Sequence, residues 1–237
     1  MDWAAPPIEL KLNLEEITTG ISIRGLSFQG EIKSKGRRLV SEKLVGFQAI
    51  FQFGRSYLLN ASVGDGAWAL SWIVGGELQE QSGKLELDGN LYTRADRRKA
   101  AWLVRFSEIR RFGLFSTSVE AQIRHGLFDT SSQDRYRGSE RQIREDFNLT
   151  PGRYRRPLSQ LSSEAWRASC AIGLANGKKI FCFPHMDYLR PNFVDEYRHL
   201  WLEDTLTYLK KSGALVLFPA MLTPANDGLC DEVTSLT

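Results

Sequence analysis

Two glycines in a short loop are the residues of this sequence best placed to do chemistry. Gly64 and Gly66, with Asp65 between them, lie after a short apolar run at residues 56–60 and before a run of helix formers at residues 67–74. In a loop that joins a strand to a helix, backbone N–H groups and the helix N-terminus can hold a phosphate. The order of strand, tight loop and helix therefore predicts a candidate phosphate site.

The histidines and cysteines indicate no second site. The chain has three of each, scattered singly, without the spacing of a metal site or of a Ser/His/Asp triad. Cys170, Cys182 and Cys230 form no CxxC pair, and we interpret them as reduced core or tail residues of a cytosolic protein. We therefore predict no metal site and no catalytic residue.

Length and composition indicate a globular protein. The chain has 237 residues, of which 42% are hydrophobic, enough to bury a substantial core. The net charge is only +3, so charge alone does not indicate a nucleic acid or an anionic surface as a partner. Residues 1–10 do not resemble a signal peptide, and no run approaches the roughly 20 apolar residues that span a bilayer. We expect any membrane association to go through a partner.

The first elements that would position the loop are strands. Residues 17–28 contain an alternation of apolar and polar residues, and residues 44–53 continue with apolar and aromatic ones, which predicts two strands of a small antiparallel sheet. Residues 83–89 alternate and end in a turn pair, which predicts another strand with Leu85 and Leu87 inward.

The remaining elements are helical and then α/β. Residues 101–106 are predicted as a buried strand, and the pattern then turns helical and polar. Ser162 and Glu164 precede a predicted capped helix at residues 165–175. A strand, a helix and a strand are predicted after it, at residues 179–183, 193–211 and 214–218.

Four segments together resemble the nucleotide-binding subunits of ABC transporters. The segment NASVGDGAWALSWIVGG at residues 60–76 resembles the Walker A loop and helix of that family, and SGKLELDG at residues 82–89 resembles the strand that follows. LSSEA at residues 161–165 is similar to the signature, and IFCF at residues 180–183 to the Walker B strand. The resemblance covers residues 21–222 and implies an α/β fold, a P-loop NTPase-like ABC nucleotide-binding domain with an antiparallel β subdomain and a helical subdomain.

The resemblance also implies a division of the chain. Residues 1–16 would be an N-terminal extension, and residues 17–225 would form the ATPase-like domain, with its helical lobe at about residues 107–160. The acidic, small-residue end at residues 226–237 is expected to be a frayed C-terminal tail.

The Walker A segment lacks the residues that the family uses to hold ATP. Ala67 stands where the family has the lysine that reaches the phosphates, and Trp68 where it has the serine or threonine that holds magnesium. Alanine carries no charge and tryptophan no oxygen, so the charge stabilisation and the metal site are both lost. We favour an ordinary strand, turn and helix, with Trp68 packed where phosphate would lie, over a working ATP site.

Other positions depart from the family in the same direction. Pro184, His185 and Met186 replace the family's Asp-Glu-Pro after the Walker B strand, which leaves no magnesium carboxylate and no general base glutamate. His185 could act as a substitute base because its ordinary pKa suits the task, but we favour a surface or loop histidine. Further family residues, the Q-loop glutamine, the D-loop aspartate and the switch histidine, are replaced near Ser107, at Arg190 or Pro191, and at Ala220 or Met221.

The signature is the partial exception. In ABC dimers this segment faces the nucleotide of the partner subunit. Ser162 matches the family serine, whereas Ser163 and Glu164 replace two glycines, and a carboxylate so near a phosphate should repel it. Ser162 is therefore interpreted first as a helix N-cap and second as a residue that acts across a dimer.

Two basic stretches remain, and a solvated, partly paired face is the simplest interpretation of both. The first lies around the Q-loop position, where family members receive the coupling helix of the membrane subunit, so the functional interpretation is docking on a membrane partner or on anionic lipid headgroups. Nucleic acid is not expected, because no nucleic-acid motif accompanies the charge. The two stretches comprise Arg94, Arg97, Arg98, Lys99, Arg105, Arg110 and Arg111, and then Arg135, Arg137, Arg141, Arg144, Arg153, Arg155 and Arg156.

The resemblance implies a degenerate, noncatalytic ATP-binding-cassette subunit. It would pair with a second nucleotide-binding subunit, as a heterodimer or homodimer, and dock on an integral membrane permease. The chain would then be cytoplasmic and peripheral to the membrane. Degenerate nucleotide contacts would fall to Gly64, Asp65, Gly66 and Ser162, and ATP with magnesium could bind only at a composite site with a partner. Two alternatives stay open: a weakly active or nucleotide-sensing ATPase, and a soluble scaffold or regulator derived from one.

Overall fold

The structure is a computed structural model of the chain. It describes residues 19–33, 39–105, 117–128, 138–161, 164–189 and 192–236. Among these residues, no helix has the length and apolar character that would carry it across a membrane.

The first sheet is antiparallel. It contains β1 (Gly20–Lys33), β2 (Leu39–Gln52), β4 (Ser82–Leu87) and β5 (Asn90–Leu91), in the order β2-β1-β4-β5. Ile21 of β1 pairs with Phe51 on one side and with Leu87 on the other. Ile21, Ile23 and Leu85 are buried, as expected from the alternation, because every second side chain of a strand faces the same side.

The second sheet is parallel throughout. It contains β3 (Ser56–Asn60), β6 (Ala101–Leu103), β7 (Ile180–Cys182), β8 (Leu215–Ala220) and β9 (Glu232–Ser235), in the order β6-β7-β8-β3-β9. All six residues of β8 are buried, which is typical of a strand covered on both faces.

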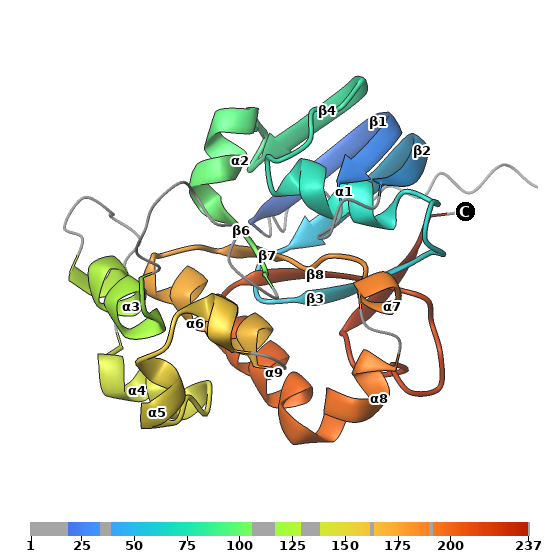
Figure 1. Cartoon of the computed structure of the whole chain (residues 1–237). Helices are drawn as coiled ribbons and strands as arrows, with labels where there is room; N and C mark the ends of the chain where they lie inside the picture. The colour runs from blue at the N-terminus through green and yellow to red at the C-terminus, as the bar shows by residue number, and fades with distance from the viewer. Residues whose placement is uncertain are drawn as a thin grey trace, which may run out of the picture.

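The parallel sheet lies between two layers (Figure 1). On one side are the antiparallel sheet and two helices, α1 (Ala67–Val74) and α2 (Arg94–Ala100). Inward residues of β1 and β2 form one hydrophobic core there with α1 and with residues of β3, β7 and β8. This packing brings β2 against the loop that precedes α1.

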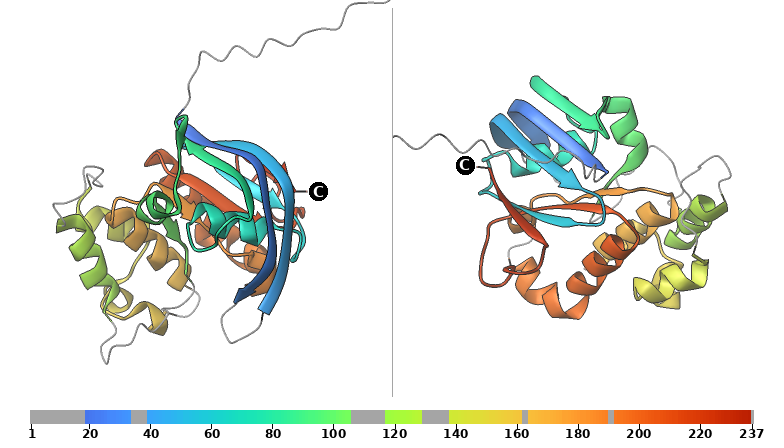
Figure 2. Two further views of the ribbon diagram at one scale, coloured as in Figure 1. Left: turned by 90° about the horizontal axis from the view of Figure 1, so that it is seen from above. Right: turned by 180° about the vertical axis from the view of Figure 1, so that it is seen from behind.

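The other side of the parallel sheet is helical, and its buried residues form a second core. The central helix is α6 (Ala165–Ala175), which is buried along its whole length. The small helices α3 (Val119–Phe128), α4 (Glu140–Asp146), α5 (Pro151–Tyr154) and a 3-10 turn (Leu158–Gln160) pack together beside α6, away from the antiparallel sheet (Figure 2).

The segment after β7 contains α7 (Met186–Leu189) and then a long helical stretch. α8 (Phe193–Tyr197), a π-helical turn (Arg198–Leu202) and α9 (Glu203–Lys211) follow one another without a break. The sequence predicted one helix over residues 193–211, and the π turn inside it is a local widening that the apolar spacing does not reveal.

The expectation of a frayed tail at residues 226–237 is wrong. β9 lies in this segment and adds to the parallel sheet beside β3. Asp231 holds it there, because its carboxylate accepts hydrogen bonds from the backbone N–H and the hydroxyl of Ser56 and pairs with Lys210. The sequence predicted a tail because the segment is acidic and rich in small residues, whereas these long-range contacts supply the order.

Candidate functional site

The glycine loop joins β3 to α1, as the sequence predicted. Gly66 is the N-cap of α1 and adopts the left-handed conformation with φ 90°, and no side chain caps the helix. Asp65 is exposed, and its N–H donates to the carbonyl oxygen of Ser62 within the loop. The N-terminus of α1 is therefore left to be satisfied from outside the loop.

A carboxylate from β2 satisfies the N-terminus of α1. Glu42 Oε1 accepts a hydrogen bond from the N–H of Gly64 at 2.9 Å, and Oε2 accepts one from the N–H of Ala69 at 3.3 Å. The Glu42 residue is completely buried. The arrangement satisfies N–H groups of the loop and of the first turn of α1, and it places negative charge at the positive end of the helix dipole.

Two opposing influences act on Glu42. Burial raises the pKa of its carboxyl above the ordinary value, and this is the largest effect. The backbone N–H groups of Gly64, Ala69 and Gly66, together with an electrostatic interaction with His185, act to lower the pKa again. The loop thus recovers part of the free energy that burial of the charge costs.

The backbone of β2 explains why Gly66 is needed. The N–H of Lys43 donates to the carbonyl oxygen of Gly64 at 2.9 Å, so β2 lies directly on the loop. A Cβ added to Gly66 would come within 2.7 Å of the Lys43 carbonyl oxygen and 2.9 Å of the Leu44 Cβ. Gly66 is therefore required both by its positive φ and by the close approach of β2.

The two positions that would carry the lysine and the magnesium ligand are both apolar and buried. Ala67 has no exposed surface and Trp68 is 1% exposed. The Trp68 ring packs edge-on against Trp72, with centroids 5.7 Å apart, and against Tyr188 at 5.4 Å. Trp68 is packed in the core, as expected. It does not take the place of phosphate, however, because the group hydrogen-bonded to the N–H groups of the loop is Glu42.

His185 lies in the loop between β7 and α7, in line with the expectation of a surface or loop histidine, but it is completely buried and not at the surface. Its Nε2 lies 3.0 Å from the carbonyl oxygen of Ala61. The preceding residue, Pro184, is also buried, which brings the chain after β7 close to the start of the glycine loop. Periodicity could not reveal this burial, because it depends on contact between segments far apart in the sequence.

The strand at the Walker B position offers only apolar side chains and a buried thiol. Phe181, Cys182 and Phe183 have no exposed surface, and burial raises the pKa of the Cys182 thiol far above its ordinary value. Ser71 of α1 donates a hydrogen bond of 2.6 Å to the carbonyl oxygen of Phe183. A serine and a backbone carbonyl thus join α1 to this strand. Within the described part of the chain, no group of three or more His, Cys, Asp or Glu residues could hold a metal ion.

Several predicted site positions fall outside the described residues. These are Ser162, Ser163, Ser107, Arg190 and Pro191. Glu164, which is described, is the N-cap of α6 but makes no side-chain capping bond. Its carboxylate instead pairs with Arg153 and lies 3.5 Å from Arg167. The ion pair between Glu164 and Arg153 therefore joins the start of α6 to α5.

The end of β8 has apolar residues at the positions where the family would have its switch histidine. Ala220 is buried, whereas Met221 is 47% exposed and Leu222 is 43% exposed. The N–H of Leu222 donates to the Asn60 side chain at 2.8 Å, which ties the segment to the end of β3. Val63 of the glycine loop, which is 38% exposed, is a further exposed apolar side chain of this region.

The first basic stretch is largely used inside the fold. Arg97 is completely buried and pairs with Glu80 at 2.6 Å. Arg94 donates to the carbonyl oxygens of Gly76 and Glu77, and Arg98 also donates to Gly76. These bonds join the start of α2 to the turn that follows α1. Arg110 and Arg111 lie outside the described residues.

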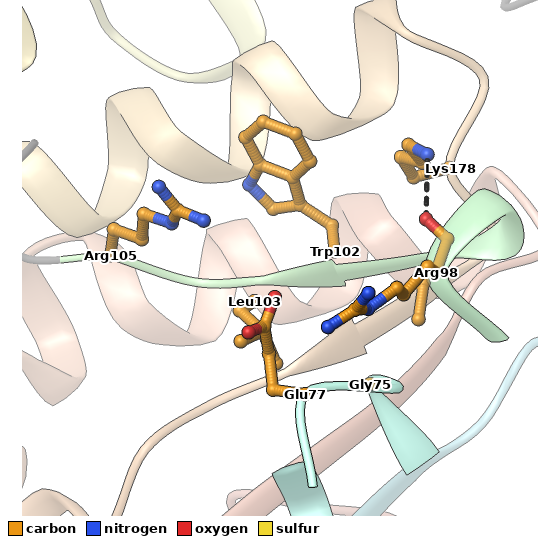
Figure 3. A pocket seen from close by; sticks show the side chains of 8 residues that line it. Gly75, Glu77, Arg98, Trp102, Leu103, Arg105 and Lys178 are labelled. Atoms are coloured by element: carbon orange, nitrogen blue, oxygen red, sulfur yellow. Dashed lines mark hydrogen bonds between the residues drawn. The ribbon is translucent and has the colours of Figure 1, made fainter. Parts of the chain in front are cut away.

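A cavity of about 360 Å³ lies beside β6 in this stretch. Arg98 and Glu77 face it from one side of the strand, and Arg105 and Trp102 lie on the other (Figure 3). Lys178 completes the wall and donates to the carbonyl oxygens of Arg98 and Lys99. Three cationic side chains against one carboxylate give the cavity a positive balance.

The second basic stretch fits the interpretation of a partly paired face. Arg141 pairs with Glu145 at 2.7 Å, and Glu140 accepts hydrogen bonds from Arg124. Arg153 pairs with Glu164, as described above. Arg135 and Arg137 lie outside the described residues.

Glu42 is the residue of the site that sequence reasoning missed. The strand over residues 44–53 was predicted to begin after it, whereas β2 begins at Leu39. The signal was nevertheless present, because Val40, Glu42 and Leu44 occupy alternate positions and all three are buried. A carboxylate in the inward register of a strand, between two apolar residues, needs a partner on the buried side.

Comparison with known proteins identifies the fold. No family model matches the chain, and no curated protein matches its sequence. Among solved structures, the chain is similar to cbiO1 from Clostridium perfringens, described as part of the ABC transporter complex cbiONQ. The TM-score is 0.61 at 16% identity, over 93% of this chain and 85% of that one.

Two other structures give the same result. An ATP-binding subunit of an ABC transporter aligns with a TM-score of 0.63 at 15% identity, over 92% of this chain and 86% of that one. An ABC transporter ATP-binding protein from Pyrococcus furiosus aligns with a TM-score of 0.62 at 16% identity, over 92% and 98%. The chain therefore has the fold of an ABC transporter nucleotide-binding domain, which confirms the fold class expected from the sequence.

Proposed function

We propose that this chain is a noncatalytic ATP-binding-cassette subunit. The observation that carries the proposal is the state of the glycine loop. Glu42 is hydrogen-bonded to its N–H groups, and the two positions that should contact phosphate and magnesium hold the buried residues Ala67 and Trp68. A polyphosphate at this loop would meet the carboxylate of Glu42 and would find no lysine to bind it. Two negative charges so close together repel each other.

The loop after β7 supports the same conclusion. Hydrolysis of ATP by this fold would need a metal carboxylate and a base near the phosphates, and the described residues here are Pro184, His185 and Met186, all buried. His185 makes a contact with the Ala61 carbonyl oxygen, which favours a structural role over that of a substitute base. Gly64, Gly66 and Asp65 would then shape the loop without holding a nucleotide.

The role that remains for the fold is assembly. In this proposal the chain pairs with a second nucleotide-binding subunit and docks on a membrane permease, so that it lies in the cytoplasm at the membrane surface. The positive cavity formed by Arg98, Arg105 and Lys178 supports docking on an anionic surface. The exposed apolar side chains of Val63, Met221 and Leu222, after the ends of β3 and β8, support pairing there without a nucleotide between the subunits.

Equilibrium binding of a labelled ATP analogue to the purified chain, with and without magnesium, tests the proposal. We expect no binding up to millimolar concentration, whereas an intact ABC ATPase in the same assay should bind. Magnesium-dependent binding would contradict the noncatalytic assignment. Co-expression with an intact ABC ATPase and a permease encoded beside it tests the assembly, and stable co-purification of the three is the expected result.

A further inference from the structure

The glycine loop has the contacts of an occupied anion site, and its occupant belongs to the chain. Glu42 Oε1 and Oε2 accept hydrogen bonds from Gly64 and Ala69, which lie at the two ends of the turn into α1. This is the way in which a loop between a strand and a helix holds a phosphate oxygen. We propose that Glu42 is an internal substitute for phosphate, bound in the loop as a ligand would be.

The position of Glu42 supports a ligand role over an ordinary core role. Its inward neighbours along β2, Val40 and Leu44, are apolar and buried, so an apolar residue would suit the strand better at this position. An apolar side chain would, however, leave the N–H groups of Gly64 and Ala69 unsatisfied inside the protein. The carboxylate is therefore required by the loop and not by the sheet.

The contact also connects two layers of the fold. The carboxylate and the hydrogen bond from Lys43 N–H to the Gly64 carbonyl oxygen both join β2 to the loop. A free phosphate could enter only if Glu42 left. The loop is thus held in the form that a bound anion would favour. This inference concerns the chain alone, and it does not depend on pairing or on docking.

Chemical rescue tests the inference. Glu42→Ala removes Cγ, Cδ and both carboxylate oxygens, and these are the heavy atoms of acetate. We expect the variant to be less stable than the wild type, and its Tm to rise with acetate concentration as a binding curve requires. Sodium chloride at the same concentrations should not reproduce the rise, because chloride cannot accept both hydrogen bonds in the same geometry.

Two control variants separate a specific site from a general effect of salt. Leu44→Ala destabilises the same strand but creates no anion site, so its Tm should respond to acetate as the wild type does. Glu42→Gln retains the volume of the side chain, which leaves no space for acetate, and it should show no rescue. An equal response of all variants, or no response of Glu42→Ala, would overturn the proposal.

A second measurement covers the case in which Glu42→Ala does not fold. In the wild type, the amide N–H signals of Gly64 and Ala69 should shift together when the Glu42 carboxylate takes up a proton, with one shared midpoint. The same signals in Glu42→Gln should not show this titration. Amides that fail to titrate in the wild type would mean that the carboxylate does not bind them as an anion.

Discussion

His185 Nε2 lies 3.0 Å from the carbonyl oxygen of Ala61, and this contact joins the segment after β7 to the first residue of the glycine loop. The resemblance to an ATPase would place nucleotide and magnesium between these two segments. In this protein the side chain of His185 joins the two segments directly. The stability of this region should therefore depend on His185 and not on a ligand.

Replacement of His185 by phenylalanine tests this dependence. An aromatic ring stays at this position but cannot donate, so the buried Ala61 carbonyl oxygen loses its donor, and we expect a loss of at least about 1–3 kcal/mol in the free energy of unfolding. Urea unfolding measures the difference. His125→Ala is the control, since His125 is exposed and its removal should change stability by less than about 0.5 kcal/mol. Equal stability of His185→Phe and the wild type would show that the contact of His185 with Ala61 does not stabilise the fold.

Glu42 should make the free energy of unfolding depend on pH. Its pKa is raised in the folded protein, so the folded state binds a proton at pH values where the unfolded chain has lost it. The contribution of Glu42 is therefore fully present below its ordinary pKa of 4.5 and is lost as the pH rises through the folded value. Relative to Glu42→Gln, the wild type should gain stability in urea unfolding as the pH falls from neutrality toward the ordinary pKa of 4.5. The opposite trend would show that the loop stabilises the ionised form more than burial opposes it.

Restoring the family's lysine should not restore ATP binding. Ala67 has no exposed surface, so Ala67→Lys places an ammonium group in the core, and we expect a loss of several kcal/mol in stability. The labelled ATP analogue should still not bind, because Glu42 occupies the loop. Ala121→Lys, at an exposed position of α3, is the matched control and should be close to neutral. Magnesium-dependent binding by Ala67→Lys would mean that the missing lysine alone had disabled the site.

The contacts of β9 can be tested at Asp231. Burial acts to raise the pKa of this carboxyl, but the hydrogen bonds from Lys210 and Ser56 outweigh it and lower the pKa. Asp231→Ala should cost about 1 kcal/mol near neutral pH, a value limited by the solvent exposure of the Lys210 pair. Because a lowered pKa contributes stability above the unfolded pKa and loses it as the pH falls through the folded value, the difference should vanish in strong acid. A difference independent of pH would assign the effect to packing instead.

The parts of the fold that could be predicted from the sequence are those encoded by local patterns. α1 and α6 have the predicted bounds, because each is a run of apolar and small residues with a clear start and a clear end. The alternation in residues 83–89 gave β4, with Leu85 buried as predicted. Helices and strands of this kind can be predicted without knowing which distant segments contact them.

The parts that could not be predicted depend on contacts between distant segments. Glu42 meets Gly64 across 22 positions, and His185 meets Ala61 across 124. β9 is held by Asp231 against Ser56, 175 positions away. In each case the partner of a polar residue lies far along the chain, so local pattern could not reveal the contact.

The place of β9 in the parallel sheet has a consequence for how the protein forms during synthesis. β3 is made early, yet its neighbour β9 lies far downstream, as the distance of 175 positions between Ser56 and Asp231 shows. Until β9 leaves the ribosome, one edge of β3 has no partner in the finished sheet, and unpaired edges of apolar strands invite association between chains. The yield of soluble protein should therefore be sensitive to translation speed and to chaperones, even though β9 covers this edge of β3 in the finished sheet.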